Sequence, residues 1–184
     1  MSIYNPTCPD SCSDSVPAVL FDYCAPDVNY GQIDKLYVAA YNAASFADWT
    51  SLSEWLSRID NTSVDIDAIR ELSVMGSKPA PTRDAIEISG DRKIYSPATH
   101  TIDVKVDETN EENYEFLRTL ECNSYYKIWY AAGKYLYGGY DGIIVDSFFL
   151  DDLIPENSKE LNIFQGVAEW ENQFHPERIL NPML

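Results

Sequence analysis

The sequence predicts an α+β fold: a mainly antiparallel β-sandwich or barrel with one or two flanking helices and an extended N-terminal arm. Three observations in this chain of 184 residues support that prediction. Several segments alternate apolar and polar residues and are rich in β-branched and aromatic side chains, as strands are. Two segments place apolar residues at helical spacing behind a capping pattern. Prolines interrupt the first 27 residues, at positions 6, 9, 17 and 26.

The arm covers residues 1–27, and residues 28–184 are expected to form a single β-rich domain. Proline removes backbone donors and favours extended conformations, so the arm shows no helical or strand period. It nonetheless carries apolar side chains, at Val16, Val19, Leu20, Phe21 and Tyr23. An extended apolar segment lies against a surface, and the sequence leaves two open: the protein's own domain or a neighbouring subunit.

The domain begins with a predicted strand and an amphipathic helix. Residues 33–41 are rich in β-branched and aromatic residues, which favours a strand. Ser51 and Glu54 match a capping box, in which each side chain satisfies a free amide at the start of a helix. Apolar residues then recur at helical spacing, which predicts a short helix over residues 51–59.

A long loop near residues 76–98 is expected to follow the next predicted strand, residues 69–75. Glycine and two prolines at the start of this loop predict an irregular connection. Residues 85–89 and 93–95 alternate weakly on either side of the turn signal Gly90-Asp91. The loop is therefore expected to contain a β-hairpin.

Residues 101–106 alternate so that Ile102, Val104 and Val106 share one face, as a half-buried antiparallel strand requires. The segment Thr109-Asn110-Glu111-Glu112 then forms a second capping pattern, and its glutamates suit the positive end of a helix. We expect a helix over residues 109–121 that covers one face of the sheet.

Strands and turns are predicted for the rest of the chain. Residues 124–132 predict an aromatic strand, and Gly133 permits a tight reversal after it. The glycine-rich segment 138–142 predicts a turn, the apolar run 143–150 follows, and a final strand is expected around residues 161–170.

Thirteen basic and thirty acidic residues give a formal charge of −17. Such a surface repels nucleic-acid phosphates and anionic lipid, so DNA-, RNA- and membrane-binding roles are disfavoured. The charge serves either solubility alone or the avoidance of a nearby polyanion, and composition does not choose between them. The start of the chain lacks the basic residues of a signal peptide, and Asp146 breaks the apolar stretch after Gly142, so a soluble protein made in a cytoplasm is expected.

The four cysteines are too few and too unevenly placed for a secreted disulfide framework. Cys8 and Cys12 have the C-x3-C spacing of two zinc ligands, and Cys24 is a third candidate ligand in the arm. No second tight pair follows, and Cys122 lies far away in sequence. Reduced thiols, a local disulfide and a zinc site remain open as alternatives.

No catalytic residues and no cofactor are predicted. The paired carboxylates Asp65/Asp67, Glu111-Glu112 and Asp151-Asp152 are expected by chance among thirty acidic residues. The serines lack a nucleophile-elbow context, and neither His100 nor His175 lies near a nucleophile in sequence. The segment His175-Pro176-Glu177-Arg178 is interpreted as a terminal docking segment. The sequence therefore predicts a scaffold protein whose function depends on assembly.

Aromatic residues suggest a second hypothesis. Seven of them fall within a short stretch, at Tyr125, Tyr126, Trp129, Tyr130, Tyr135, Tyr137 and Tyr140. Exposed aromatic platforms with polar neighbours bind saccharides. Alternatively, some of these rings fill the core and the rest lie in a subunit interface, where tyrosine and tryptophan are enriched.

The block of residues 99–178 resembles the tail-tube and tail-ring structural proteins of tailed bacteriophages. The similarity lies in the order of its elements: strand, helix, aromatic strand, Gly138-Gly139 hairpin, and a last strand that ends in Trp170. Three short segments are also similar to structural proteins of phages that infect Bacteroidetes, including the crAss-like group; they are residues 76–81, 107–110 and 176–178.

The resemblance implies a tail-tube-like subunit that closes into a ring around the DNA channel of a virion, after synthesis and assembly in the host cytoplasm. The loop near residues 76–98 and the arm 1–27 would bridge to adjacent subunits or rings. Its partners would be further copies of itself and other tail, neck or portal proteins. DNA would pass nearby without specific binding, because an acidic lumen repels phosphates.

Three hypotheses follow from the sequence. The first is a non-enzymatic structural protein that forms a ring of a phage tail or neck. The second is a carbohydrate-binding β-sandwich module on a virion surface. The third is a small zinc-stabilised adaptor that uses Cys8, Cys12 and Cys24.

Overall fold

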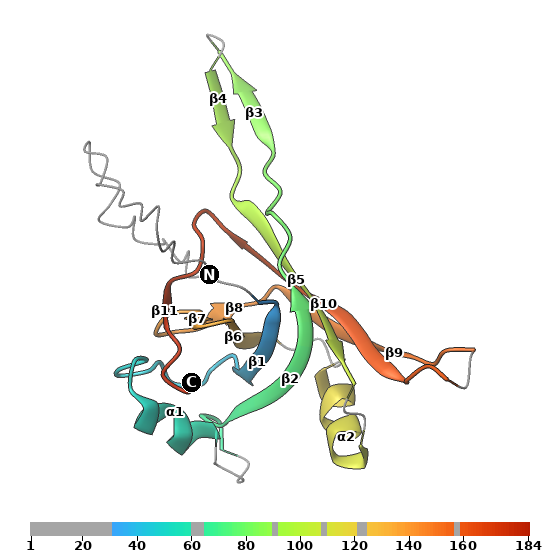
Figure 1. The fold of residues 1–184 in the computed structure, drawn as a ribbon. Helices are drawn as coiled ribbons and strands as arrows, with labels where there is room; N and C mark the ends of the chain where they lie inside the picture. Colours follow the sequence, from blue (N-terminus) through green and yellow to red (C-terminus); the bar gives the residue numbers. More distant parts are fainter. Residues whose placement is uncertain (1–30, 60–64, 90–91, 108–109, 121–124, 157–158) are drawn as a thin grey trace, which may run out of the picture. The chain divides into compact units, whose positions relative to one another are not determined.

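The computed structural model describes residues 31–59, 65–89, 92–107, 110–120, 125–156 and 159–184. These residues belong to one compact unit, Gly31–Leu184. The predicted arm, residues 1–27, lies outside the described residues. The described part is mainly antiparallel sheet with two helices, which confirms the predicted α+β class (Figure 1).

Nine strands of the described part form one sheet, in the order β11–β7–β6–β1–β2–β5–β10–β9, and β8 pairs with β6 beside β7. The bounds of these strands are Ile33–Ala40 (β1), Ile69–Ser77 (β2), Ala98–Val106 (β5), Tyr126–Ala132 (β6), Tyr135–Tyr137 (β7), Ile143–Ile144 (β8), Ser147–Leu153 (β9), Ile163–Asn172 (β10) and Arg178–Leu180 (β11). Strands β3 (Ala85–Ile88) and β4 (Arg92–Tyr95) form a separate two-stranded sheet. The hairpin predicted between residues 85 and 95 is therefore confirmed.

The large sheet folds over itself at a corner formed by Val145 and Asp146. The N–H of Val145 donates to the carbonyl oxygen of Tyr126 in β6 at 3.1 Å, and that of Asp146 donates to Glu169 in β10 at 2.8 Å. The Asp146 carboxylate also accepts the N–H of Glu171 at 2.9 Å. Two consecutive residues thus connect opposite parts of the sheet, as in sandwiches and barrels whose strands change layers at a bend.

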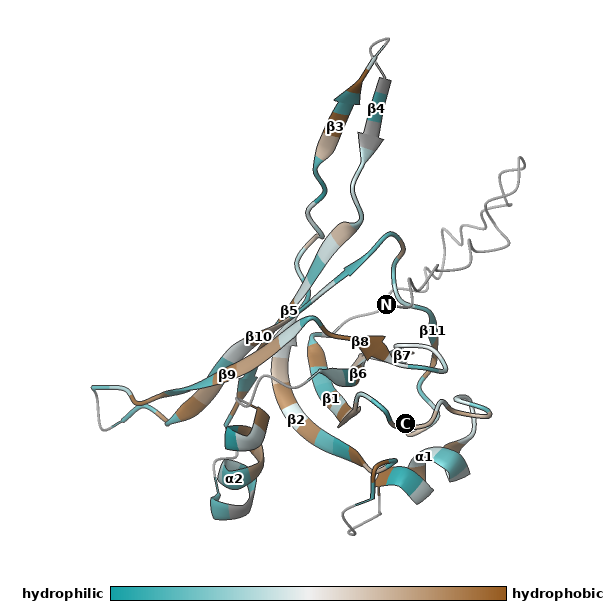
Figure 2. Ribbon diagram, turned by 180° about the vertical axis from the view of Figure 1, so that it is seen from behind, coloured by the Kyte–Doolittle hydropathy of each residue, from teal (hydrophilic) through white to brown (hydrophobic). Residues whose placement is uncertain are grey.

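The main core lies between the two halves of this folded sheet and under helix α2 (Glu111–Leu120). Alternate residues of β5 face it as predicted, since Ile102, Val104 and Val106 are all buried. The register places Ala168 of β10 opposite Ile102. Figure 2 shows the corresponding alternation of hydrophobic and hydrophilic residues along β2.

A second core covers the other face of β1 and β6. Its centre is an aromatic cluster formed by Tyr37, Phe46, Trp49, Trp55 and Trp129, all of them buried. Trp129 makes edge contacts with Phe46 and Trp55, with ring centroids 5.5 and 5.6 Å apart. The indole N–H of Trp55 donates to the carbonyl oxygen of Trp49 at 2.8 Å. Strands β1 and β6 are consequently buried on both faces.

The predicted glycine turn wraps around Trp129. The indole N–H donates to the carbonyl oxygen of Gly139 at 2.9 Å. Gly138 and Gly142 have φ values of +141° and +73°, and a Cβ atom at either position would lie 2.3 or 2.7 Å from the indole ring. Only glycine combines this backbone geometry with such a close approach.

Both predicted helices are present, and their ends differ slightly from the expected bounds. Helix α1 spans Leu52–Ile59 and buries Trp55. Helix α2 begins after Asn110, whose side chain accepts the N–H of Asn113 at 2.9 Å and so acts as the N-cap. Thr109, the expected cap, lies outside the described residues.

Two features of the C-terminal region differ from the sequence prediction. The apolar run 143–150 is divided between β8 and β9, because the corner at Val145 and Asp146 changes the pairing partner from β6 to β10. An additional short strand, β11, pairs with β7 close to the chain end. Its three residues carry too little periodicity to be recognised as a strand.

The contact between the glycine turn and Trp129 gives a direct test. Gly142→Ala is expected to lower the free energy of unfolding by about 1–3 kcal/mol more than Gly139→Ala does. Both glycines have nearly the same φ, +73° and +74°, so backbone strain cancels in the comparison. A Cβ at Gly142 would meet the indole at 2.7 Å, whereas at Gly139 the nearest atom is the flexible end of Glu177 at 3.3 Å. Chemical denaturation measures both losses, and equal losses would contradict the packing argument.

Candidate functional site

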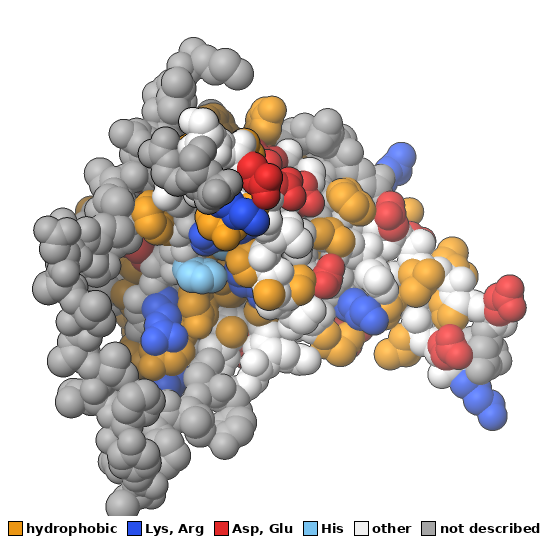
Figure 3. Space-filling model, turned by 90° about the horizontal axis from the view of Figure 1, so that it is seen from above, with side chains coloured by type: hydrophobic (Ala, Val, Ile, Leu, Met, Phe, Trp, Pro, Cys, Tyr) orange, Lys and Arg blue, Asp and Glu red, His pale blue; other side chains and the backbone are white. Residues whose placement is uncertain are grey.

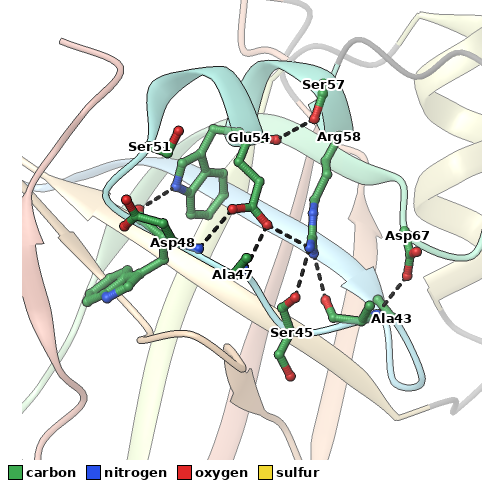
Figure 4. A network of polar contacts seen from close by, with 12 residues as sticks. Ala43, Ser45, Ala47, Asp48, Ser51, Glu54, Ser57, Arg58 and Asp67 are labelled. Carbon is green, nitrogen blue, oxygen red and sulfur yellow. Dashed lines mark hydrogen bonds and ion pairs between the residues drawn. The ribbon is translucent and has the colours of Figure 1, made fainter.

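A polar network holds α1 over the aromatic cluster (Figure 4). The guanidinium of Arg58 donates to the carbonyl oxygens of Ala44 at 2.6 Å and Ser45 at 2.9 Å. It also lies 4.2 Å from the centroid of the Phe46 ring and pairs with the Glu54 carboxylate at 3.0 Å. Because each charged group here is paired within the chain, we assign the network a structural role.

The carboxylate of Glu54 differs from its predicted role in a capping box with Ser51. It accepts the N–H groups of Ala47 at 3.0 Å and Asp48 at 2.9 Å, which precede the helix by several residues. The hydroxyl of Ser51 instead contacts that of Ser53 at 3.0 Å. Glu54 therefore holds the segment before the helix against α1.

The β3–β4 hairpin is the first candidate assembly surface. Among the described residues its two strands pair only with each other, and Figure 1 shows the hairpin extending beyond the ends of β2 and β5. At its base, a bridge joins Thr82 to Thr99. Ile86 and Tyr95 are 56% and 60% exposed, so the hairpin presents apolar side chains to solvent.

A second surface lies at the far end of the β9–β10 hairpin. Ile154 and Leu161 are 70% and 72% exposed there, and Leu153 is half exposed as well. Asp151 and Asp152 precede them in β9 and are exposed. We call these five residues the acidic hairpin end. In Figure 3 this end of the molecule, on the right, shows acidic and hydrophobic side chains together with a basic one.

The outward face of β5, β10 and β9 carries a row of carboxylates. Cross-strand partners point to the same side of a sheet, and the register pairs Asp103 with Val167 and Asp151 with Gln165. Glu169 lies two residues after Val167, on this same face. All of these acidic side chains are exposed. Lys105, which the register also pairs with Gln165, is exposed on this face as well, so the three carboxylates leave the face net negative.

At the base of the β3–β4 hairpin lies a basic cluster: Lys78, Arg83, His100 and His175. The Nζ atom of Lys78 lies 3.3 Å from Nδ1 of His100. The ring of His175 lies 5.8 Å from that of His100, edge to face. Arg83 donates from Nη2 to the carbonyl oxygen of Gln173 at 3.0 Å. Figure 3 shows histidine and basic side chains gathered on this side of the molecule.

His100 is fully buried and is held in one tautomer. Lys78 can only donate, so Nδ1 of His100 accepts, and Nε2 carries the hydrogen that faces the carbonyl oxygen of Asn172 at 3.3 Å. The ring stacks on Trp170 with centroids 5.3 Å apart. Burial lowers the pKa of His100 below its usual value of 6.5, and the nearby charges of Lys78, His175 and Arg83 lower it further, against the effect of the bond to Asn172.

The candidate residues that fall in the described part of the chain are not brought together into one site. The zinc candidates Cys8, Cys12 and Cys24 lie outside the described residues, as does Cys122. The zinc, disulfide and free-thiol alternatives therefore stay predictions. Among the described residues, no group of three or more histidine, cysteine or acidic residues is arranged to hold a metal ion.

The paired carboxylates serve local structure or lie on the surface. Asp67 accepts the N–H of Ala44 at 2.7 Å. This bond connects the residues just before β2 to the loop that follows β1. Glu111 lies in the first turn of α2 and is exposed. The expected docking segment around Glu177 packs on its own chain, because the N–H of Gly138 donates to the carbonyl oxygen of Glu177 at 3.0 Å.

The seven aromatic residues considered for sugar binding do not share one exposed face. Five are buried or half-buried: Tyr126, Trp129, Tyr130, Tyr135 and Tyr137. Of the exposed two, Tyr125 lies 5.9 Å from Tyr41, whereas Tyr140 lies 6.1 Å from Trp49. Most of these rings therefore contribute to packing within the chain.

Sequence reasoning found the hairpin but missed the basic cluster. Lys78, His100 and His175 are far apart in sequence and carry no shared motif. One signal was available: residues 78–100 contain four basic and three acidic residues, a net charge of +1 in a chain of −17. That local reversal of charge marks the segment as unusual.

In the described part of the chain, no helix has the length and apolar character needed to cross a membrane. Comparisons with protein-family models, with curated proteins and with solved structures find no match to this chain.

The buried His100 predicts a measurable pH dependence of stability. Its folded pKa lies below the unfolded value of 6.5, so the unfolded state binds more protons as the pH falls below 6.5. Stability is therefore fully present above pH 6.5 and is lost as the pH falls towards the folded pKa. His100→Gln is expected to lose less stability between pH 7 and pH 5 than the wild type, measured by urea denaturation at each pH. Identical losses in both proteins would refute this assignment.

Proposed function

We propose that this chain is a non-enzymatic structural protein of a phage virion that oligomerises into a ring of the tail or neck around an acidic DNA channel. The observation that carries the proposal is the β3–β4 hairpin, whose strands have no other pairing partner in the described part of the chain. An isolated two-stranded hairpin is marginally stable in water. Packing against another chain would bury the exposed side chains of Ile86 and Tyr95 and so stabilise such a hairpin.

A ring needs two different surfaces on each subunit, because it closes through head-to-tail contacts. The β3–β4 hairpin and the acidic hairpin end provide two such surfaces on separate elements. They differ in charge as well, since residues 85–95 of the hairpin carry two acidic and two basic residues and no net charge, whereas the acidic hairpin end carries Asp151 and Asp152. This asymmetry supports a ring more than a two-fold dimer, in which each surface would meet its own copy.

The outward face of β5, β10 and β9 is the proposed lining of the channel. Its exposed carboxylates outside the acidic hairpin end include Asp103 and Glu169. A lumen of like charge repels DNA phosphates, so DNA passes without being held. In this proposal the protein acts in the virion, with other tail, neck or portal proteins as its further partners.

Native mass spectrometry and electron microscopy of the purified full chain test the proposal. We expect a cyclic oligomer or stacked rings, with partner virion proteins added where the chain alone assembles weakly. A chain that remains monomeric with and without those partners would overturn the proposed function. A monomer that binds glycans would favour the carbohydrate-binding alternative, for which the buried aromatic residues give no specific support.

A hairpin variant tests which surface drives assembly. Asp84 and Ser96 close the hairpin base, since the N–H of Ser96 donates to the carbonyl oxygen of Asp84 at 2.9 Å. Replacing residues 85–95 by the turn Asn-Gly should preserve this base and leave the core intact. We expect an unchanged melting temperature and a loss of the oligomer by native mass spectrometry. If the shortened chain assembles like the wild type, the hairpin is not an assembly surface.

A further inference from the structure

We propose that the basic cluster binds carboxylates from a neighbouring copy of this chain, and that the acidic hairpin end of that copy supplies them. The inference rests on the proposed function, because a second copy must be present. It names the charged contact that would join two subunits.

Lys78 is a half-buried cation with no anion beside it in the described part of the chain. Its Nζ atom contacts the neutral ring of His100 at 3.3 Å and lies 5.8 Å from the ring centroid of Trp170. Burial lowers the pKa of Lys78, so the folded chain holds its charge at a cost in free energy. A carboxylate from outside would remove that cost, since buried charges are normally paired.

Two exposed groups around Lys78 can donate to an anion from outside, and a third, buried donor lacks an acceptor among the described residues. Arg83 is exposed and donates from Nη2 to the carbonyl oxygen of Gln173, which leaves other N–H groups of its guanidinium available. His175 is exposed beside His100. The indole N–H of Trp170 is buried and has no acceptor among the described residues. The cluster therefore has donors and positive charge but no acceptor of matching charge.

The charge distribution identifies the partner as a second copy of this chain. Residues 78–100 are net +1, so the remaining residues together carry −18. The acidic hairpin end combines Asp151 and Asp152 with exposed apolar residues. Those features complement the cations of the basic cluster and the exposed Ile86 further along the β3–β4 hairpin. Opposite charges across an interface also select the correct docking register.

Exchange of charge between the two surfaces gives a decisive experiment. One variant carries Lys78→Glu and Arg83→Glu, and the other carries Asp151→Lys and Asp152→Lys. Each variant alone places like charges at every contact, so we expect each to need a concentration about tenfold higher or more for half-assembly. In an equimolar mixture, alternating subunits restore opposite charges at both kinds of contact. The mixture is therefore expected to assemble at nearly the wild-type concentration, as measured by native mass spectrometry.

Matched controls on α2 separate a specific contact from a general effect of charge. Arg118→Glu and Glu115→Lys reverse exposed charges outside both surfaces and should assemble like the wild type. Arg83→Glu alone serves as a milder variant if Lys78→Glu lowers the melting temperature. A weakened assembly in the α2 controls equal to that in the charge variants would overturn the proposed contact.

The remaining outcomes distinguish this inference from the proposed function. A wild type that never oligomerises overturns both. A wild type that assembles, with charge variants that assemble equally well, overturns only the contact between these surfaces. Variants that fail both alone and as a mixture also overturn it. A wild type that assembles only with added duplex DNA, and loses this with Lys78→Glu and Arg83→Glu, would assign the cluster to phosphate and overturn the proposed carboxylate partner.

Discussion

The fold depends on the burial of β1 and β6 on both of their faces. One face contributes to the main core with Leu36 and Ile128, and the other contributes to the aromatic cluster with Tyr37 and Trp129. A tryptophan of this kind removes roughly 200 Å² from water, which is worth about 5 kcal/mol by area. Because both faces are filled, a shift of either strand would disturb two cores at once. The register of the central strands is fixed for that reason.

This central constraint leaves the outer elements free to differ. The β3–β4 hairpin and the β9–β10 hairpin end contribute few side chains to either core. Their apolar and charged residues are therefore not needed for folding of the domain. A protein built in this way can change its assembly contacts without changing its fold, provided that the two cores remain intact.

Polar groups near the cores and polar groups at the hairpin base also differ, in whether they find partners within the chain. Near the aromatic cluster, Glu54 and Arg58 are satisfied by each other and by backbone groups. Lys127 is buried in β6 and donates to the carbonyl oxygen of Ala43 at 2.7 Å. At the hairpin base, by contrast, Lys78 faces a neutral histidine. The polar groups beside the aromatic cluster thus have partners within the chain, whereas Lys78 lacks a carboxylate partner among the described residues.

The sequence alone determined the local elements, because those depend on periodicity, capping and turn residues. The alternation of Ile102, Val104 and Val106 predicted the buried face of β5, and the glycines at 138–142 predicted the turn. Only the tertiary structure decided that this turn encloses Trp129 and that a corner at Asp146 joins the sheet halves. The tertiary structure alone also brings Lys78, His100 and His175 together in the basic cluster. These features arise from contacts between distant segments, and no local pattern in a single sequence encodes which segments will meet.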